Sequence, residues 1–175
     1  MVNMVKVWGT LVLAAFVGGL VAPAPAEAQR LVLLVRHAER ADGGVPAPNM
    51  STPADPDLSA EGRARADRLA VMLAQAGVTR IVVSEFKRTQ QTAAPLAKLL
   101  GVTVQTISSK DTAALVSRLK SAKGTVLVVA HSNTVPEIVK GLGIATAVTI
   151  GEADHDDLFV VTPGERPALV RLHYR

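Results

Sequence analysis

Apolar runs that alternate with helix-like segments constrain the fold of this chain more than any other feature. The first run, LVLLV (31–35), is continuous, as expected of a strand that is buried on both faces of a sheet. The runs RIVVS (80–84) and TVLVV (125–129) have the same strand-forming character. Because helical patterns separate these strands, the chain is predicted to be of the α/β class, with a mainly parallel central sheet and helices on both faces.

The segments between these strands carry helix start and stop signals. Ser59 is placed to cap a helix whose apolar residues recur at three- and four-residue spacing, with Gly77 as the stop. The segment 41–57 holds four prolines and two glycines, and it predicts a loop long enough to line or cover a site. Further helices are expected over 87–100, disturbed by Pro95, over 111–122, and from a cap at Asn133 or Thr134, and further strands over 102–107, 157–161 and 168–174.

The N-terminal segment has the composition of a secretory signal peptide. Lys6 precedes an uncharged stretch (7–21), and small residues follow, ending in the small-x-small pattern AEA that signal peptidase reads. Residues 1–28 are therefore predicted to be removed, which leaves residues 29–175 as a single domain in an exported protein, periplasmic or secreted. An uncleaved anchor is the alternative, but the apolar stretch is shorter than the about 20 residues of a membrane span. No stable membrane insertion is expected after cleavage.

Charge and cysteine content narrow the classes of partner. The chain has a formal net charge of +4, and its arginines are spread along the sequence rather than gathered in a run. This pattern argues against nucleic-acid binding and favours a small anionic ligand. Cysteine is absent, so no disulfide framework supports the fold. Stability must come from packing, and the sequence gives no indication of the oligomeric state.

Basic and histidine side chains follow the strands at the points where the strands end. Arg36 and His37 come directly after the first run, and His131 follows the run at 125–130. Another strand is expected to end at Ser84, four residues before Arg88. Ligands of such sheets bind outside the carboxyl ends of the strands. Arginines and helix N-termini at one edge favour a dianion such as phosphate.

Four sequence blocks in this order resemble those of the histidine phosphatase superfamily, in its phosphoglycerate-mutase-like branch. The blocks are RHAER (36–40), LSAEG (58–62), SEFKRTQQTA (84–93) and VVAHSNT (128–134). Each block is weak alone, but their order and spacing together are specific, and the resemblance covers essentially all of residues 29–175. It implies a three-layer sandwich, a single histidine phosphatase domain, and phosphomonoester hydrolysis through a phosphohistidine.

The resemblance also implies a role for each residue at the strand ends. His37 would be the nucleophile, because a neutral imidazole nitrogen can attack phosphorus in line. Arg36, Arg88 and His131 would hold the nonbridging oxygens, where charge is spread during phosphoryl transfer. Arg40 and Asn133 are further candidates for substrate binding, although Arg40 could instead pair with Glu39. The arrangement requires no metal and no other cofactor.

The proton donor for the leaving group and the substrate stay open at this stage. Asp111, Glu39 and Glu137 are the carboxylates considered as the donor, and Asp111 could equally be a helix cap. The interval between the Arg88 and His131 blocks is short and leaves no room for a large cap over the site. Hydrolysis is therefore favoured over a mutase reaction, which must exclude water. The substrate is expected to be a phosphorylated small molecule or a phosphoprotein.

Two other classes of function remain as alternatives. One is a noncatalytic domain that binds phosphate or a phosphoprotein. The other is a metal-dependent hydrolase in which His37 and His131 act with acidic ligands. The acidic segment GEADHDDLF (151–159) is interpreted as a solvated turn before a strand, because His155 and its neighbours lack a metal-ligand spacing. His173 is expected to be structural.

Overall fold

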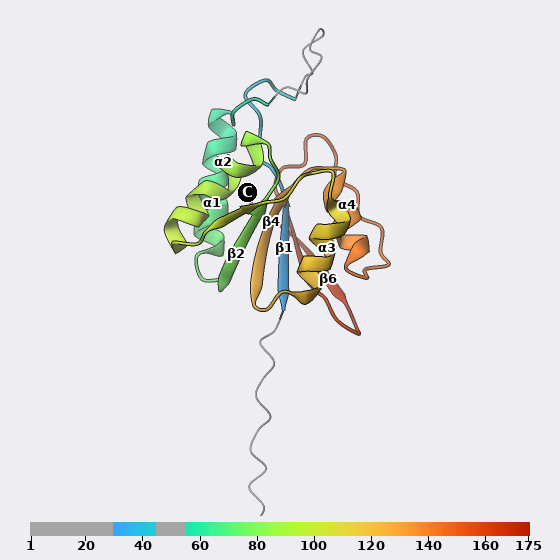
Figure 1. Ribbon diagram of the computed structural model, residues 1–175. Helices are drawn as coiled ribbons and strands as arrows, with labels where there is room; N and C mark the ends of the chain where they lie inside the picture. Colours follow the sequence, from blue (N-terminus) through green and yellow to red (C-terminus); the bar gives the residue numbers. More distant parts are fainter. Residues whose placement is uncertain (1–29, 45–54) are drawn as a thin grey trace, which may run out of the picture.

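The computed structural model describes residues 30–44 and 55–175. Its elements, in chain order, are β1 (Leu31–Arg36), α1 (Ala60–Leu73), β2 (Val78–Val83), α2 (Lys87–Leu100), β3 (Val104–Thr106), α3 (Thr112–Ser121), β4 (Thr125–Ala130), α4 (Thr134–Gly141), β5 (Asp157–Thr162) and β6 (Ala168–His173) (Figure 1). The predicted signal peptide lies outside the described residues, as do residues 45–54 of the predicted loop. Within the described part, no helix has both the length and the apolar character needed to cross a membrane.

The six strands form one sheet in the order β3-β2-β4-β1-β5-β6. The first four strands in this order run parallel, whereas β5 is antiparallel to β1 and β6 is antiparallel to β5. This confirms the predicted mainly parallel sheet. In the register of β1 and β4, Arg36 lies opposite Ala130. The residues that follow, His37 and His131, therefore leave the sheet at the same level.

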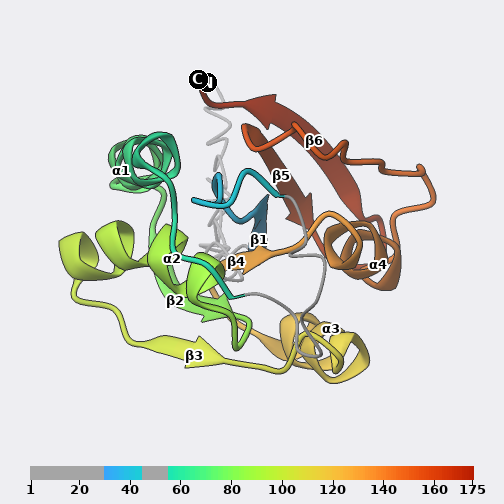
Figure 2. The same cartoon turned by 90° about the horizontal axis from the view of Figure 1, so that it is seen from above.

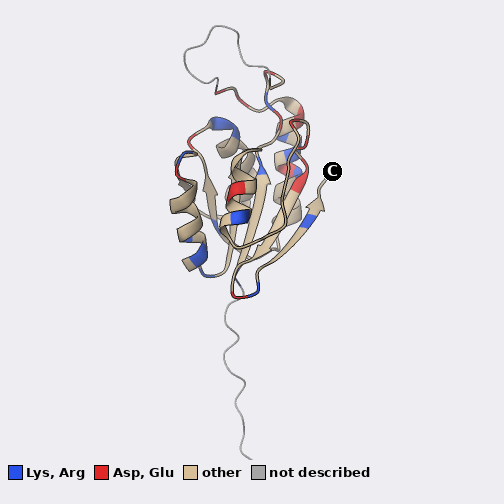
Figure 3. Ribbon diagram, turned by 90° about the vertical axis from the view of Figure 1, so that its right-hand side faces the viewer, with Lys and Arg blue, Asp and Glu red and all other residues tan. Residues whose placement is uncertain are grey.

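Helices cover the sheet on both faces and complete a three-layer sandwich (Figure 2). Side chains alternate along each strand, so each buried strand contributes to two hydrophobic clusters. Leu33 and Val35 of β1 pack with α1 and α2, whereas Val32 and Leu34 pack with α3 and α4. Charged side chains lie mainly on the helices and loops, and the strands are largely free of them (Figure 3). The charged exceptions near the ends of the central strands belong to the site described below.

Several element boundaries differ from those predicted from the sequence. α1 ends at Leu73, and a turn follows that ends at Gly77, which has a φ of 66°. β2 begins directly after this turn, at Val78, two residues earlier than predicted. α2 is one helix through Pro95, which removes one backbone hydrogen bond but leaves Ala93 and Leu96 buried. β3 is shorter than predicted, because only three of its residues pair with β2.

Candidate active site

A cleft of about 350 Å³ lies at the carboxyl ends of the central parallel strands. All six residues predicted for the site line it, namely Arg36, His37, Arg40, Arg88, His131 and Asn133. Three segments supply them: the end of β1 with the residues that follow it, the start of α2, and the turn between β4 and α4. The structure thus brings together residues that lie nearly one hundred positions apart in the chain.

The start of α1 holds the loop that carries His37. Ser59 caps this helix as predicted, because its hydroxyl accepts a hydrogen bond from the backbone N–H of Gly62 at 3.0 Å. A Cβ at Gly62 would come within 2.2 Å of the carbonyl oxygen of Glu39, so only glycine allows this close approach. The block LSAEG therefore packs against the backbone of the RHAER segment and holds it in place.

His37 is 4% exposed and is held through its backbone and its ring. Its N–H donates to the carbonyl of Ala130 at 2.9 Å, and its Nδ1 lies 2.8 Å from the carbonyl of Ala38. Because a carbonyl only accepts, Nδ1 carries the proton and Nε2 is the nitrogen with the free lone pair. Burial lowers the pKa of His37 to about 3, against the opposing effect of the Ala38 bond. The imidazole is therefore neutral near pH 7.

His131 faces His37 across the cleft, with ring centroids 5.4 Å apart. Its Nε2 lies 2.9 Å from the hydroxyl oxygen of Ser84, at the end of β2, and its backbone N–H donates to the hydroxyl of Thr134. Asn133 stands at the N-cap of α4 without a capping side-chain bond. Burial, and then the charge of Arg88, lower the pKa of His131 to about 4. Both histidines of the cleft are thus uncharged at neutral pH.

The three arginines of the cleft carry the positive charge. Arg36 donates through Nη1 to the carbonyls of Gly151 and Glu152, at 2.6 and 2.8 Å, and through Nη2 to the Glu152 carboxylate at 3.0 Å. Arg88 lies over the ring of Phe86, with 4.1 Å between the guanidinium carbon and the ring centroid. Burial and the nearby Arg40 lower the pKa of Arg88.

Four guanidinium nitrogens of these arginines are buried without a hydrogen-bond partner in the described part of the chain. They are Nε of Arg36, Nε of Arg40, and Nε and Nη1 of Arg88. An unpaired buried donor costs free energy, and more so when it is charged. A tetrahedral oxyanion in the cleft presents oxygen acceptors of the kind that these donors require.

Arg40 and Glu39 do not pair with each other, which was one of the two possibilities for Arg40. Arg40 binds Asp42 at 2.5 Å, whereas Glu39 accepts from Nε of Arg65 at 2.7 Å. Burial would raise the pKa of Glu39, but the bonds from Arg65 outweigh it and the pKa is lowered. Glu39 is therefore held as an ion-paired carboxylate, away from the lining of the cleft.

None of the three carboxylates considered as proton donor lines the cleft. Asp111 caps α3 through its side chain, and Glu137 is exposed in the first turn of α4. Within the described residues, the carboxylate that does line the cleft is Glu152, which sequence reasoning missed. It is 87% exposed and binds Arg36 and the hydroxyl of Ser132. Its position depends on the loop before β5, for which the sequence offered no signal beyond acidity.

Thr92 and His155 are further residues that sequence reasoning missed. The Thr92 hydroxyl accepts from the N–H of Ala38 at 2.9 Å and donates to the carbonyl of Arg88 at 2.7 Å. A threonine four residues after Arg88 in a predicted helix was a usable signal, because such hydroxyls often bond to the carbonyl one turn earlier. His155 donates from Nδ1 to the carbonyl of His37 at 2.9 Å. The interpretation of 151–159 as a solvated turn was thus wrong for His155.

An acidic cluster at the start of β5 and the end of β6, level with the carboxyl end of β1, has the ligand types of a metal site. Asp156, Asp157 and His173 bring their ligand atoms within 4.8 Å of one another. Arg171, however, already binds both carboxylate oxygens of Asp157, at 2.6 and 2.7 Å. A cation thus already neutralises the most buried member, and His173 lies 3.3 Å from the same carboxylate.

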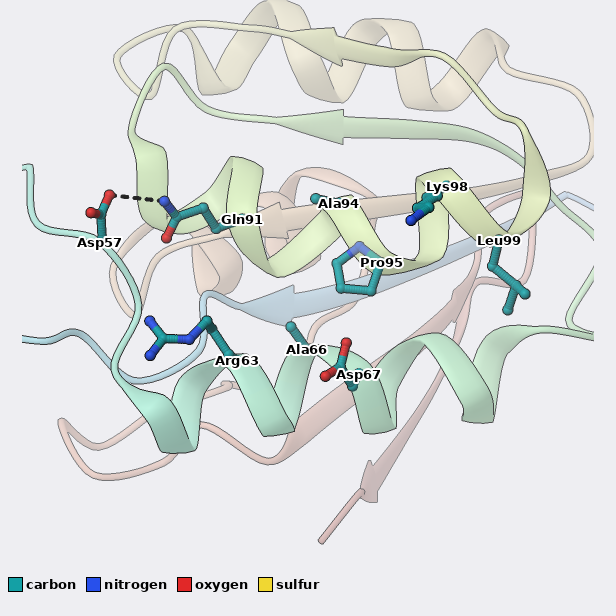
Figure 4. Close-up of a pocket in the computed structure, with 9 residues that line it drawn as sticks. All are labelled: Asp57, Arg63, Ala66, Asp67, Gln91, Ala94, Pro95, Lys98 and Leu99. Carbon is teal, nitrogen blue, oxygen red and sulfur yellow. Dashed lines mark hydrogen bonds between the residues drawn. The ribbon is translucent and has the colours of Figure 1, made fainter.

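A larger groove of about 920 Å³ lies between α1 and α2, away from the histidines (Figure 4). Ala66, Ala94, Pro95 and Leu99 give it a largely apolar lining, and Gln91 donates to Asp57 at the end nearest the cleft. None of the six predicted site residues lines this groove. Although this groove is larger than the cleft, it is not the candidate active site, because neither the two buried histidines nor the arginines with unbonded nitrogens line it.

The structure is an α/β sandwich with a cleft that is lined by two histidines and three arginines. A family model, that of the histidine phosphatase superfamily (branch 1), matches residues 32–109. No curated protein matches the sequence. The match spans the blocks of His37 and Arg88, and the structure adds His131 beside them. This match over residues 32–109 confirms the resemblance to the histidine phosphatase superfamily that was drawn from the motifs.

Solved structures share this fold at low sequence identity. The protein histidine phosphatase SixA complexed with tungstate has a TM-score of 0.65 at 18% identity, covering 82% of this chain and 96% of that chain. Mycobacterial glucosyl-3-phosphoglycerate phosphatase has a TM-score of 0.63 at 15% identity, covering 83% and 98%. A structure described as mycobacterial hydrolase 1 has a TM-score of 0.62 at 17% identity, covering 83% and 98%. These likenesses confirm the predicted fold class.

Proposed function

We propose that the protein is a phosphomonoester hydrolase that acts through a phosphohistidine on His37. One observation carries the proposal: a buried, neutral imidazole with a free Nε2 lies in a cleft where four guanidinium nitrogens have no hydrogen-bond partner among the described residues. A nucleophile and donors for the oxygens of phosphate are thus present together. The match to the histidine phosphatase family model and the phosphatases among the structural neighbours support the same reaction class.

The reaction proceeds in two displacements at phosphorus. In the first, the Nε2 lone pair forms a bond to phosphorus while the ester P–O bond breaks and its electron pair leaves with the alcohol oxygen. In the second, water attacks phosphorus, the P–N bond breaks with its electron pair returning to Nε2, and the proton lost from water passes to solvent, from which the leaving oxygen of the first step takes its proton. Arg36, Arg40 and Arg88 stabilise the charge on the nonbridging oxygens in both steps. The reaction as proposed needs no metal, because guanidinium groups supply this charge.

The substrate is a phosphorylated small molecule or a phosphoprotein that meets the protein outside the cytoplasm. The described residues that line the cleft are mainly basic and polar, with the ring of Phe86 among them, which favours selection for the phosphoryl group over a particular organic part. If residues 1–28 are a signal peptide, the exported protein lacks Trp8, its only tryptophan. Exported protein without tryptophan fluorescence would support this location, and tryptophan emission would contradict it.

Turnover of an aryl phosphate by purified protein tests the proposal. A phenolate leaves readily, so the assay does not depend on which group donates a proton. We expect turnover that is unchanged by a chelator such as EDTA. Loss of activity in the chelator would favour a metal-dependent hydrolase. Binding of inorganic phosphate without any turnover would favour a noncatalytic phosphate-binding domain.

A further inference from the structure

We propose that His155 is a positioning residue that holds the peptide group after His37 and so fixes which nitrogen of the nucleophile faces the cleft. The structural part of this inference stands on geometry alone, and its catalytic consequence rests on the proposed function. His155 lies in the loop before β5, 118 positions from His37. It belongs to none of the motifs that predicted the site.

The peptide group between His37 and Ala38 is held at both of its ends. Its carbonyl oxygen accepts from Nδ1 of His155 at 2.9 Å, and its N–H donates to the hydroxyl of Thr92 at 2.9 Å. The two partners come from different parts of the fold, the loop before β5 and helix α2. Together they prevent this peptide plane from rotating about the chain.

The orientation of this peptide group controls the proton on the nucleophile. Ala38 is completely buried, and its own carbonyl accepts Nδ1–H of His37 at 2.8 Å. A rotation of the preceding peptide group would move that carbonyl away from the ring. The proton could then reside on Nε2, which would leave no lone pair to attack phosphorus. The bond from His155 thus favours the reactive tautomer of His37.

The surroundings of His155 suit a fixed donor rather than a group that takes up charge. Its ring is tilted by 51° against that of His37, with centroids 5.9 Å apart. Burial lowers the pKa of His155, and the facing Arg36 and Arg65 add to this, against the bond to the His37 carbonyl and the charge of Glu39. A neutral His155 can still donate from Nδ1 without placing a positive charge behind the nucleophile.

Substitutions of similar size separate positioning from mere packing. The amide nitrogen of His155→Asn occupies nearly the place of Nδ1, whereas that of His155→Gln reaches toward the place of Nε2. We expect kcat for an aryl phosphate to fall by about tenfold to a hundredfold in His155→Ala and His155→Gln, as for a small misplacement of a reacting group. His155→Asn should recover kcat to within about threefold of the native value. KM should change by less than about threefold in all three variants, because the arginines are untouched.

A matched control and a second readout make the test independent of turnover. His173→Asn makes the same change at an exposed histidine of β6 and should leave kcat unchanged. The chain has only four histidines, so their imidazole ¹⁵N resonances can be assigned by substitution. His37 should be protonated at Nδ1 in the native protein and in His155→Asn, and should show mixed tautomers in His155→Ala and His155→Gln.

Two results would overturn the inference. One is an unchanged tautomer of His37 together with native kcat in His155→Ala. The other is equal behaviour of His155→Asn and His155→Gln, because packing alone would not separate these two variants. If the native protein fails to hydrolyse aryl phosphates, the proposed function is wrong, and the ¹⁵N spectra still decide whether His155 positions His37.

Discussion

The exits of β1 and β4 are the same in sequence pattern and different in chemistry. Each strand ends at paired register positions, Arg36 opposite Ala130, and each is followed by a buried histidine. The ring of His37 is held through Nδ1 by the carbonyl of Ala38, whereas that of His131 is held through Nε2 by the hydroxyl of Ser84. Opposite ring nitrogens therefore stay free in the two residues.

This difference shows how two equivalent sequence signals come to serve two steps of one reaction. A backbone carbonyl is a fixed acceptor, so it sets the tautomer of His37 and leaves Nε2 unprotonated. A hydroxyl both donates and accepts, so the Ser84 contact of His131 imposes no single tautomer. The first arrangement suits a nucleophile, and the second suits a group that contacts phosphate oxygens and adjusts its proton.

Removing the imidazole ring of His37 or of His131 should have the largest effect on kcat, and the two losses should differ. His37→Ala should lower kcat for an aryl phosphate by at least about a thousandfold, because no nucleophile remains. His131→Ala should lower kcat by about tenfold to a hundredfold, because it removes one phosphate contact. Steady-state rates of both folded variants check this. Equal losses in the two variants would break the comparison and favour a metal site shared by both histidines.

Arg88 lines the same cleft as His37 and His131, and its substitution tests the proposed oxyanion site. Arg88→Lys keeps the charge but loses the planar fork, of which two nitrogens are buried without a hydrogen-bond partner in the described part of the chain. We expect kcat to fall by about tenfold to a thousandfold, with His37 still the site of phosphorylation. Lys98→Arg on the outer part of the same helix is a control that should leave kcat unchanged. Near-native turnover in Arg88→Lys would exclude Arg88 from the site.

The pairing of His37 with His131 followed from the sequence, because parallel strands present their carboxyl ends at one edge. The strands were continuous apolar runs, and Arg88 came at the start of the next helix, so the main residues of the cleft could be named. The hydrogen-bond partners that make His37 and His131 chemically different could not be named from the sequence. Ser84 was identified only as the end of a strand, and its bond to His131 depends on the neighbouring positions of β2 and β4.

Loop contacts escaped prediction for the same physical reason. Glu152 and His155 reach Arg36 and His37 across 116 and 118 positions of sequence, from a loop whose composition suggested only solvent exposure. Local patterns predict periodic elements, but they carry no information on where an irregular loop returns. Glu39 was misleading in the opposite way, since its proximity in sequence to His37 concealed its pairing with Arg65.

The lowered pKa values of the two histidines predict how stability changes with pH. Both fall from the ordinary value of 6.5, to about 3 in His37 and about 4 in His131. Between pH 6.5 and pH 4 the unfolded chain therefore binds protons that the folded protein does not. Stability present above pH 6.5 is lost as pH falls through this window, by up to about 1.4 kcal/mol per pH unit for each histidine.

Urea unfolding of native protein and His37→Gln at pH 7, 6 and 5 measures this loss. The free energy of unfolding should fall less steeply with decreasing pH in His37→Gln than in the native protein, because one of the two groups is gone. His131→Asn should flatten the dependence in the same direction by a similar or smaller amount. Parallel curves for the native protein and both variants would show that the histidines titrate normally in the folded protein.

The smallest expected effect concerns a carboxylate outside the two strand exits. Asp111 accepts from the backbone of Ala114 at the start of α3. Asp111→Ala should lower the free energy of unfolding by about 1 kcal/mol through loss of this cap, with kcat unchanged. Asp111→Asn retains a capping oxygen and should be nearly as stable as the native protein. A loss of kcat for an alkyl phosphate, whose leaving oxygen requires a proton, at native stability would instead identify Asp111 as a proton donor.

The position of phosphate on the enzyme tests the central claim most directly. Rapid quenching during turnover of a phosphorus-labelled aryl phosphate, followed by peptide mass analysis and NMR of the labelled peptide, identifies both the residue and the ring nitrogen. We expect an acid-labile, alkali-stable phosphate on Nε2 of His37, formed equally in the presence of chelator and absent from His37→Ala. Phosphate on His131, phosphate on Nδ1 of His37, or substantial turnover by His37→Ala would contradict the account.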